Sequence, residues 1–235
     1  MGLIQVNNLG ILIKTVDGPM EIVRDVSFSI DRGERLGIVG ESGCGKSITA
    51  LALMSLLPPN SVVSGQILLD GQDLVNTDRR ELNRIRGNRI GMIFQEPMTA
   101  LNPVKTIGSQ IAESLILHSD LVKHQRLERV KDLMECVGLP VERFPLNLFP
   151  HQLSGGQRQR VMIAIAIACE PDLLIADEPT TALDVTVQEQ ILELIEDLIT
   201  RFNMALIMIS HDLGVIAQTT EKVMVMYTGG VMEQG

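Results

Sequence analysis

The sequence predicts an α/β protein in which helices cover a parallel sheet, preceded by a strand-rich part and interrupted by a helical insertion. Three observations predict this fold class. Strand and helix patterns alternate in the second half of the chain, which is typical of parallel sheets with helical crossovers. Residues 1–75 contain strand patterns broken by Gly, Pro, Asn and Asp. Between residues 78 and 138, apolar residues recur at helical spacing instead.

The composition indicates a globular protein with an aliphatic core. The 235 residues are 45% hydrophobic and 21% charged, which is ordinary for a folded domain. There is no Trp, 1 Tyr and 5 Phe, so aliphatic residues and 12 Met must fill the core. The formal net charge of −9 disfavours a protein that coats nucleic acid or anionic membranes by bulk charge.

The sequence shows no sign of secretion, of a disulfide framework or of a membrane span. Cys44, Cys136 and Cys169 are widely spaced and lack the spacing of metal ligands. Residues 1–10 lack the basic stretch and apolar core of a signal peptide. The longest stretch without charged residues, 47–69, is broken by two prolines and leaves about half the apolar length that a span needs. We therefore expect a soluble intracellular chain.

The individual elements follow from apolar runs and the turn residues between them. Val26, Phe28 and Ile30 alternate with serines, which predicts a half-buried strand. We expect strands at 26–30, 35–39, 62–69, 89–94, 173–177 and 205–210, and a hairpin over 222–234 that turns at 228–230. We expect helices at 48–57, 79–86, 108–117, 125–137, 155–168 and 187–201.

Two of these helices begin with the sequence of a capping box, in which a hydroxyl and a later amide or acid satisfy reciprocal backbone donors. The pairs are Ser154 with Gln157, and Thr186 with Glu189. The second helix also carries an apolar stripe that we expect to face the core: Ile191, Leu194, Ile195 and Leu198.

A glycine-rich segment between a predicted strand and helix matches G-x-x-x-x-G-K-[ST]. It reads Gly40, Glu41, Ser42, Gly43, Cys44, Gly45, Lys46, Ser47, and Ile48 follows it. Glycines let the backbone fold around an anion with its N–H groups inward, and the helix N-terminus adds its dipole. We expect Lys46 to neutralise β- and γ-phosphate oxygens and Ser47 to ligate Mg²⁺. The sequence therefore predicts a phosphate loop that binds a nucleotide.

A second element supplies acidic groups. The apolar strand at 173–177 ends in Asp177 and Glu178. Asp177 is suited to hold Mg²⁺ through water, and Glu178 to polarise the attacking water as a general base. A strand that ends in Asp-Glu is usually only a solvated strand end. Its position after a phosphate loop favours the catalytic interpretation.

Further motifs resemble those of the ABC ATPases. Residues 153–160 read LSGGQRQR, similar to the signature motif of that family. Gln95 matches the glutamine of the Q-loop, and His211 matches the switch histidine. The D-loop is matched by Ala182-Leu183-Asp184. The resemblance implies a P-loop NTPase with a RecA-like core, an N-terminal antiparallel β subdomain and an inserted α-helical subdomain.

The resemblance also implies how the chain is divided. The whole chain, 1–235, would be a single ABC ATPase domain. Residues 1–94 and 155–235 would form the β subdomain and the RecA-like core. Residues 95–154 would form the helical subdomain, which carries the signature loop at its end.

In the family, two such domains pair head to tail, and each ATP lies between one phosphate loop and the other subunit's signature loop. The resemblance implies that Ser154 caps a helix whose N-terminus faces the γ-phosphate across this interface. Asp184 would reach across the dimer. The remaining nucleotide-contacting residues of the signature motif would be Gly155, Gly156 and Gln157.

The resemblance assigns catalytic and metal-binding roles as well. Gln95 would touch Mg²⁺ and the attacking water, and would report the nucleotide state to the helical insertion. His211 would hold the γ-phosphate. The expected catalytic residues are Glu178, His211 and Gln95, and the expected metal-binding residues are Ser47, Gln95 and Asp177.

Three other segments resemble the ATPase subunits of bacterial oligopeptide, dipeptide and nickel importers: Arg86-Gly87, 93–103 and 149–152. This implies ATP hydrolysis coupled to transport, with peptides as the expected cargo, by a peripheral subunit at the cytoplasmic face of the membrane. The implied partners are a second ATPase subunit (identical or paralogous), transmembrane permease subunits and, indirectly, a substrate-binding protein; no nucleic acid is expected.

The membrane subunit would insert a short helix near the Q-loop. Met98 and Leu101 are candidates to line that contact, and core burial is an equal alternative for both. Two features depart from the family pattern. Ile13 stands where the family usually has an aromatic residue stacked on adenine, and Phe28 is assigned to the core. Members of the importer group also usually continue beyond the last residues of this chain.

Two other functions are compatible with the motifs. A soluble ABC ATPase that acts on nucleic acid or ribosomes usually carries a coiled coil, a zinc element or a second ATPase domain, and the sequence shows none of these. The chain could also be one half of a tandem fused transporter ATPase.

Overall fold

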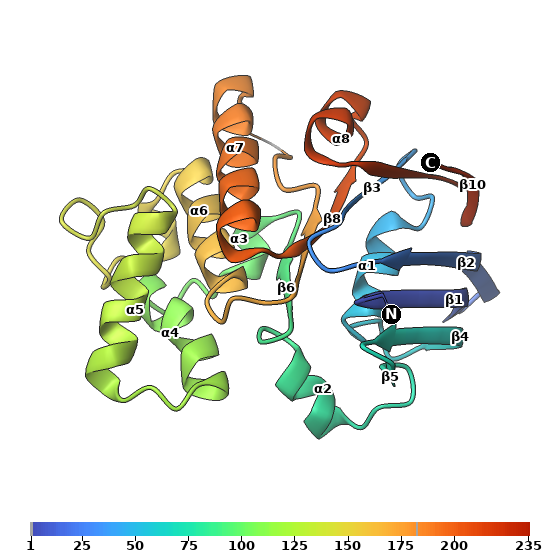
Figure 1. Cartoon of the computed structure of the whole chain (residues 1–235), viewed down its shortest axis with the longest axis horizontal. Coiled ribbons are helices and arrows are strands. Elements are labelled where there is room, and N and C mark those ends of the chain that lie inside the picture. Colours follow the sequence, from blue (N-terminus) through green and yellow to red (C-terminus); the bar gives the residue numbers. More distant parts are fainter. Residues whose placement is uncertain (1, 182) are drawn as a thin grey trace. The chain divides into compact units, whose positions relative to one another are not determined.

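The computed structural model describes residues 2–181 and 183–235 (Figure 1). The chain forms two compact units. The first unit runs to Asn83 and resumes over Ala205–Gly235, and the second unit is Arg84–Met204. Within the described residues, no helix combines the length and apolarity needed to cross a membrane.

The first unit contains an antiparallel sheet, which confirms the expected N-terminal β subdomain. Its strands are β1 (Ile4–Thr15), β2 (Gly18–Ile30), β4 (Ser61–Leu69) and β5 (Gln72–Asp73), in the order β2-β1-β4-β5. The three long strands lie side by side in Figure 1. Val26, Phe28 and Ile30 are buried while the serines between them are exposed, as their alternation predicts.

The first unit also holds parallel strands. Strand β3 (Arg35–Gly40) pairs in parallel with both β8 (Ala205–Ser210) and β9 (Lys222–Tyr227), and β9 pairs antiparallel with β10 (Gly230–Gln234). The predicted hairpin is confirmed. Its turn has a positive φ at Thr228 and at Gly229, which matches the twist of the flanking strands. Helices α1 (Lys46–Leu53) and α8 (Leu213–Thr219) belong to this unit.

The second unit combines a parallel strand pair with helices. Strands β6 (Ile90–Ile93) and β7 (Leu173–Asp177) are buried along their whole length, as expected for strands covered on both faces. The helices are α3 (Pro97–Ala100), α4 (Ile107–His118), α5 (Lys123–Cys136), α6 (Gly155–Ala166) and α7 (Val185–Phe202), with a 3₁₀ turn at Pro150–Gln152. Helix α2 (Arg79–Ile85) lies in the segment where the two units meet in sequence.

Helix α6 lies at the centre of the helices of the second unit. It packs against α3, α4, α5 and α7. The antiparallel sheet of the first unit, the parallel strands of each unit and the helices of the second unit confirm the predicted fold class. The subdomain boundaries at 94/95 and 154/155 stay a prediction.

Two expectations about helix ends are wrong. The first helix spans Lys46–Leu53 rather than 48–57, because Ser55 adopts a left-handed φ of 49° that ends it. Thr186 does not begin a capping box: Asp184 is the N-cap and accepts from the Val187 N–H (3.1 Å), so α7 starts two residues earlier. A carboxylate is a strong N-cap and takes this role from the hydroxyl.

The apolar stripe of α7 is also shifted. Ile191, Ile195 and Leu198 are buried, but Leu194 is only half-buried. Leu192 and Ile199 complete the buried face instead. The short helices α3 and α8 have no counterpart among the expected elements.

Candidate nucleotide and catalytic site

The phosphate loop is a tight backbone cradle at the carboxyl end of β3. Its glycines Gly40, Gly43 and Gly45 have φ values of 155°, 82° and 104°. A Cβ at Gly40 would lie 2.2 Å from the Met226 carbonyl oxygen, so no side chain fits there. At Gly45 the left-handed φ makes glycine the favoured residue.

Lys46 begins α1, and its side chain folds back into the loop. The Nζ atom donates to the carbonyl oxygens of Gly40 (2.8 Å) and Glu41 (3.0 Å), and the residue is 5% exposed. Among the residues that the structure describes, no carboxylate pairs with this ammonium. Its contacts are two carbonyl oxygens and the Cys44 sulfur. A buried cation with such neutral partners has an uncompensated charge, which an anion would balance.

The start of α1 also suits an anion. Gly45 is the N-cap, and within the described ranges no side chain caps the helix and no acidic residue lies in its first turn. The positive end of the helix dipole is therefore not neutralised locally. Ser47 and Ile48 lie half-buried in the first turn, while Glu41 and Ser42 are exposed. These residues fit the phosphates of a nucleotide.

Cys44 lies at the base of this loop. It is 5% exposed, its Sγ lies 3.9 Å from Lys46 Nζ, and a Cβ added at Gly40 would come within 2.7 Å of the sulfur. The thiol therefore packs inside the loop. Its nearest cation is the same ammonium that is expected to bind phosphate.

The sheet register of the first unit brings His211 to the phosphate loop's edge. Val39 pairs with Ser210 across β3 and β8. Gly40, the last residue of β3, and His211, the first residue after β8, therefore lie at the carboxyl ends of neighbouring parallel strands. Asp212 caps α8 by accepting from the Gly214 N–H (2.7 Å), which fixes the chain just after the exposed His211.

In the second unit, Gln95 and Glu178 meet beyond the ends of β6 and β7. Ile93 pairs with Ala176, which places the two following loops side by side. Gln95 Nε2 donates to Glu178 Oε2 (3.3 Å). Asp177 is 5% exposed at the end of β7.

Glu178 has a left-handed φ of 45°. This conformation is uncommon for a residue with a side chain and turns the chain sharply at the strand end. Thr181 Oγ1 donates to Glu178 Oε2 (2.9 Å). Sequence reasoning missed Thr181, although its hydroxyl three residues after the acid is a signal for such a turn contact.

The signature segment forms the start of α6, as predicted. Ser154 Oγ accepts from the Gln157 N–H (3.3 Å), and Gln157 Oε1 accepts from the Ser154 N–H (2.9 Å), which completes the capping box. A Cβ at Gly156 would lie 2.7 Å from Val187 Cγ1, so this glycine lets α6 approach α7. Gly155 is half-buried beside Leu183.

Two more residues of these motifs have structural roles. Arg160 Nη1 donates to the Val137 carbonyl (2.8 Å) at the end of α5, and burial lowers the pKa of its guanidinium. Asp184 is exposed and caps α7. Of the predicted D-loop, Ala182 lies outside the described residues.

The two candidates for membrane-subunit contact differ. Leu101 is 3% exposed and belongs to the core, whereas Met98 is 59% exposed, and its sulfur contacts the Arg158 guanidinium. Ile13 is half-exposed on β1. Phe28 is 6% exposed, as its assignment to the core predicts.

The predicted site residues thus form two groups, one in each unit. The phosphate loop and His211 belong to the first unit, and Gln95, Asp177, Glu178, the signature segment and Asp184 belong to the second. A phosphate loop, a strand-end carboxylate held by a glutamine, and a capped glycine-rich helix start together define an ATP-binding cassette, a class of P-loop ATPases.

Comparisons with known proteins agree with this class. Residues 23–181 match the family model described as ABC transporter. The chain belongs to the ABC transporter family. It therefore shares the family's ATP-binding ATPase domain.

Individual relatives indicate a particular group within this family. The oligopeptide transport ATP-binding protein OppD of Bacillus subtilis is 50% identical over 99% of this chain, and that of Salmonella typhimurium is also 50% identical over 99%. The dipeptide transport ATP-binding protein DppD of Bacillus subtilis is 49% identical over 99%. The chain spans 66%, 70% and 70% of the length of these three relatives.

Solved structures share the fold along the chain. A dimeric ATP-binding cassette in a post-hydrolysis state, bound to ADP and Pi, has a TM-score of 0.87 and 30% identity, covering 99% of this chain and 97% of that one. The structure of cbiO1 from Clostridium perfringens, part of an ABC transporter complex, has a TM-score of 0.82 and 27% identity, covering 100% and 88%.

Proposed function

We propose that this chain is the ATP-binding and ATP-hydrolysing subunit of a bacterial ABC importer for peptides. It acts as a peripheral subunit at the cytoplasmic face of the membrane, with transmembrane permease subunits and, indirectly, a substrate-binding protein. The identity of about half of all residues to oligopeptide and dipeptide transport subunits supports the peptide cargo.

One observation carries the hydrolytic activity. Glu178 is held at the end of a buried strand by a left-handed backbone and by hydrogen bonds from Gln95 and Thr181. A carboxylate fixed in this way is suited to orient a water and accept its proton. Gln95 touches the same oxygen, so its position is coupled to the carboxylate that would act as the base.

The phosphate loop supplies binding rather than proton transfer. In this proposal, Lys46 and the uncapped start of α1 bind the negatively charged phosphates. Ile13 would contact adenine by dispersion alone. We assign the contact with the γ-phosphate to His211, which follows the neighbouring strand β8.

The oxygen-bearing side chains Ser47, Gln95 and Asp177 suit Mg²⁺, which prefers carboxylate, amide and hydroxyl oxygens. Bound Mg²⁺ would supply charge neutralisation on the phosphates. Asp177 is buried at the end of β7, next to the proposed general base Glu178.

We further propose that two copies, or this chain and a paralogue, pair head to tail. Each nucleotide then meets the phosphate loop of one subunit and the capped start of α6, with Ser154 to Gln157, of the other. Asp184 also faces the partner in this arrangement. The dimeric form of the similar cassette bound to ADP and Pi supports the proposal.

The test uses E178Q, which keeps the shape of the side chain but removes the base. We expect ATP turnover to fall by about 10²–10⁴-fold, while size-exclusion chromatography with ATP and Mg²⁺ shows a stable dimer. The exposed α7 variant E189Q serves as control and should behave as the wild type. If E178Q stays monomeric with ATP and Mg²⁺ at every protein concentration, the shared-site arrangement is wrong.

A further inference from the structure

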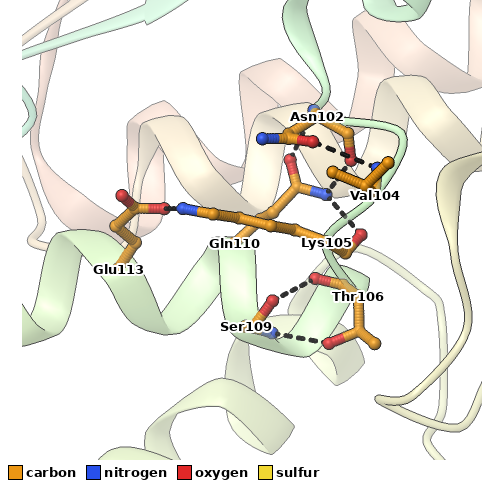
Figure 2. A network of polar contacts seen from close by, with 7 residues as sticks. All are labelled: Asn102, Val104, Lys105, Thr106, Ser109, Gln110 and Glu113. Carbon is orange, nitrogen blue, oxygen red and sulfur yellow. Dashed lines mark hydrogen bonds and ion pairs between the residues drawn. The ribbon is translucent and has the colours of Figure 1, made fainter.

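The loop between α3 and α4 is tied to α4 by a buried glutamine. Gln110 lies on α4 and is 7% exposed. Its Oε1 accepts from the Asn102 N–H (2.8 Å), and its Nε2 donates to the carbonyl oxygens of Asn102 (3.0 Å) and Lys105 (3.0 Å) (Figure 2). One side chain thus satisfies three main-chain groups of the loop.

Weaker contacts at the surface support the same loop conformation. Asn102 Oδ1 accepts from the Val104 N–H (3.0 Å), and Ser109 Oγ donates to the Thr106 carbonyl (2.7 Å) (Figure 2). Lys105 pairs with Glu113 (2.9 Å) in an exposed ion pair. Exposed ion pairs contribute little, whereas hydrogen bonds in a low-dielectric environment are stronger. Gln110 is therefore the principal clamp.

The clamped loop presents apolar groups outward. Leu101 and Ile107 anchor its two ends in the core at 3% and 0% exposure, while Val104 is 80% exposed. Met98, in the preceding helix, is 59% exposed. Main-chain groups of Asn102, Val104 and Lys105 are hydrogen-bonded within this region. The loop therefore presents the exposed Val104 side chain on a fixed backbone, beside the exposed polar side chains of Asn102 and Lys105.

The same segment leads directly to the catalytic carboxylate. Gln95, which donates to Glu178, lies two residues before Pro97, the first residue of α3. The α3 helix is short and is itself held at its start, because Glu96 accepts from the Met98 N–H (3.0 Å). A displacement of Gln95 is therefore transmitted through α3 to the loop over 102–105. It changes the position of the loop's exposed side chains only if the loop keeps its conformation.

We infer that Gln110 is a positioning residue for energy coupling. It keeps the loop over 102–105 in one conformation, so that a cytoplasmic apolar segment of the membrane subunit seated on Val104 and Met98 responds to the position of Gln95. This inference rests on the proposed function. Gln110 touches neither nucleotide-binding nor catalytic groups, so its loss should separate hydrolysis from transport.

The test compares two variants. Q110M keeps the length of the side chain but replaces its amide with an apolar thioether, and E113Q breaks only the exposed ion pair. Each subunit is assembled with its membrane subunits in phospholipid vesicles. A mixture of short radiolabelled peptides serves as transport probe. Peptide uptake per ATP hydrolysed is measured, and the basal ATPase rate of the isolated subunit is measured separately.

For Q110M we expect uptake per ATP to fall about tenfold, because the three hydrogen bonds of the Gln110 amide are lost, with basal hydrolysis changed less than about twofold. Amide hydrogen exchange of the loop over 102–105 should accelerate in the isolated variant, a readout independent of activity. E113Q should match the wild type. Unchanged uptake per ATP in Q110M, or an equal loss of basal hydrolysis and uptake, overturns the inference.

A second variant adds a signature that a general loss of stability does not produce. In Q110E the ionised carboxylate can still accept from Asn102 N–H but cannot donate to either carbonyl. On protonation it regains one donor, so uptake per ATP should recover as the pH is lowered, relative to the wild type at each pH. A pH-independent defect contradicts the clamp.

If Q110M does not fold, the surface variant N102A replaces it. It removes only the acceptor for the Val104 N–H and should lower uptake per ATP with normal basal hydrolysis; wild-type coupling in N102A and in Q110E at all pH values overturns the inference. If the wild-type complex takes up no peptide although its subunit hydrolyses ATP, the proposed function fails. Accelerated loop exchange in Q110M would still distinguish that failure from failure of the clamp.

Discussion

The starts of α1 and α6 are both glycine-rich and are both proposed to contact nucleotide, but they are built in opposite ways. Helix α1 begins at a glycine without a side-chain cap, beside a buried ammonium that lacks a carboxylate partner among the described residues. Helix α6 begins with a complete capping box between Ser154 and Gln157. The first start is incomplete without an anion. The second is stable by itself and is suited to join a site that another subunit has already filled.

The largest effect should come from removing the charge at α1. In K46A we expect the affinity for ATP to fall about 10²-fold, because a charge-assisted hydrogen bond to phosphate contributes about 1.5–3 kcal/mol. The thermal stability without nucleotide should be retained, since the variant no longer buries an unpaired charge. Nucleotide titration and thermal denaturation measure the two quantities.

The exposed K14A variant is the matched control for K46A. It should leave both the affinity and the stability unchanged. If K46A bound ATP as tightly as the wild type, the start of α1 would not depend on its anion, and the contrast with α6 would disappear.

A smaller but still clear effect is expected at Cys44. Because the thiol packs inside the loop next to Lys46 Nζ, an alkyl group there would displace the ammonium. We expect a thiol-alkylating reagent to block ATP binding and bound ATP to protect Cys44 from the reagent. Mass spectrometry of labelled Cys44 and ATP titration of the same sample provide the measurement.

The control C44A should bind ATP and keep its affinity after treatment with the reagent. Full ATP binding after stoichiometric labelling of Cys44 would contradict the placement of the thiol within the phosphate-binding loop.

The smallest effect should come from the cap of α6. In S154A we expect a loss of about 1 kcal/mol in the free energy of unfolding, as for other N-cap substitutions. ATP binding to the isolated subunit should not change, whereas ATP-induced dimerisation should weaken. Denaturant titration, nucleotide titration and size-exclusion chromatography separate these three results.

The matched control for S154A is T106A, which removes the N-cap of α4 (Thr106 accepts from the Ser109 N–H). It should lose a similar stability without any effect on dimerisation. Equal weakening of the dimer in both variants would show that the start of α6 has only a structural role.

Much of the fold was predictable because its signals are local. Strands at 173–177 and 205–210 have the predicted bounds, since continuous apolar runs between turn residues indicate buried strands. The start of α7 was not predictable from the sequence, because Asp184 and Thr186 are both acceptable N-caps. Only the path of the chain from β7 selects between them. The short helices α3 and α8 lack enough residues for a periodic signal.

The candidate site shows the same division. The motif that contains Lys46 and Ser47 identifies a phosphate loop by its residue types alone, and Glu178 stands out as an acid at the end of an apolar strand. Thr181 and Gln110 do not stand out in the sequence, because each acts through hydrogen bonds to groups that only the folded chain brings within reach. A threonine in a loop and a glutamine in a helix are common in any sequence.

The sequence by itself determined the kind of chemistry, since glycine spacing, a lysine and two acids restrict what a backbone can bind and which group can accept a proton. Only the tertiary structure decided which groups meet within each unit. The parallel register of β3 with β8 places His211 beside the loop edge, and that of β6 with β7 brings Gln95 to Glu178. Hydrogen-bond partners far apart in the chain are selected by packing, which local sequence patterns do not encode.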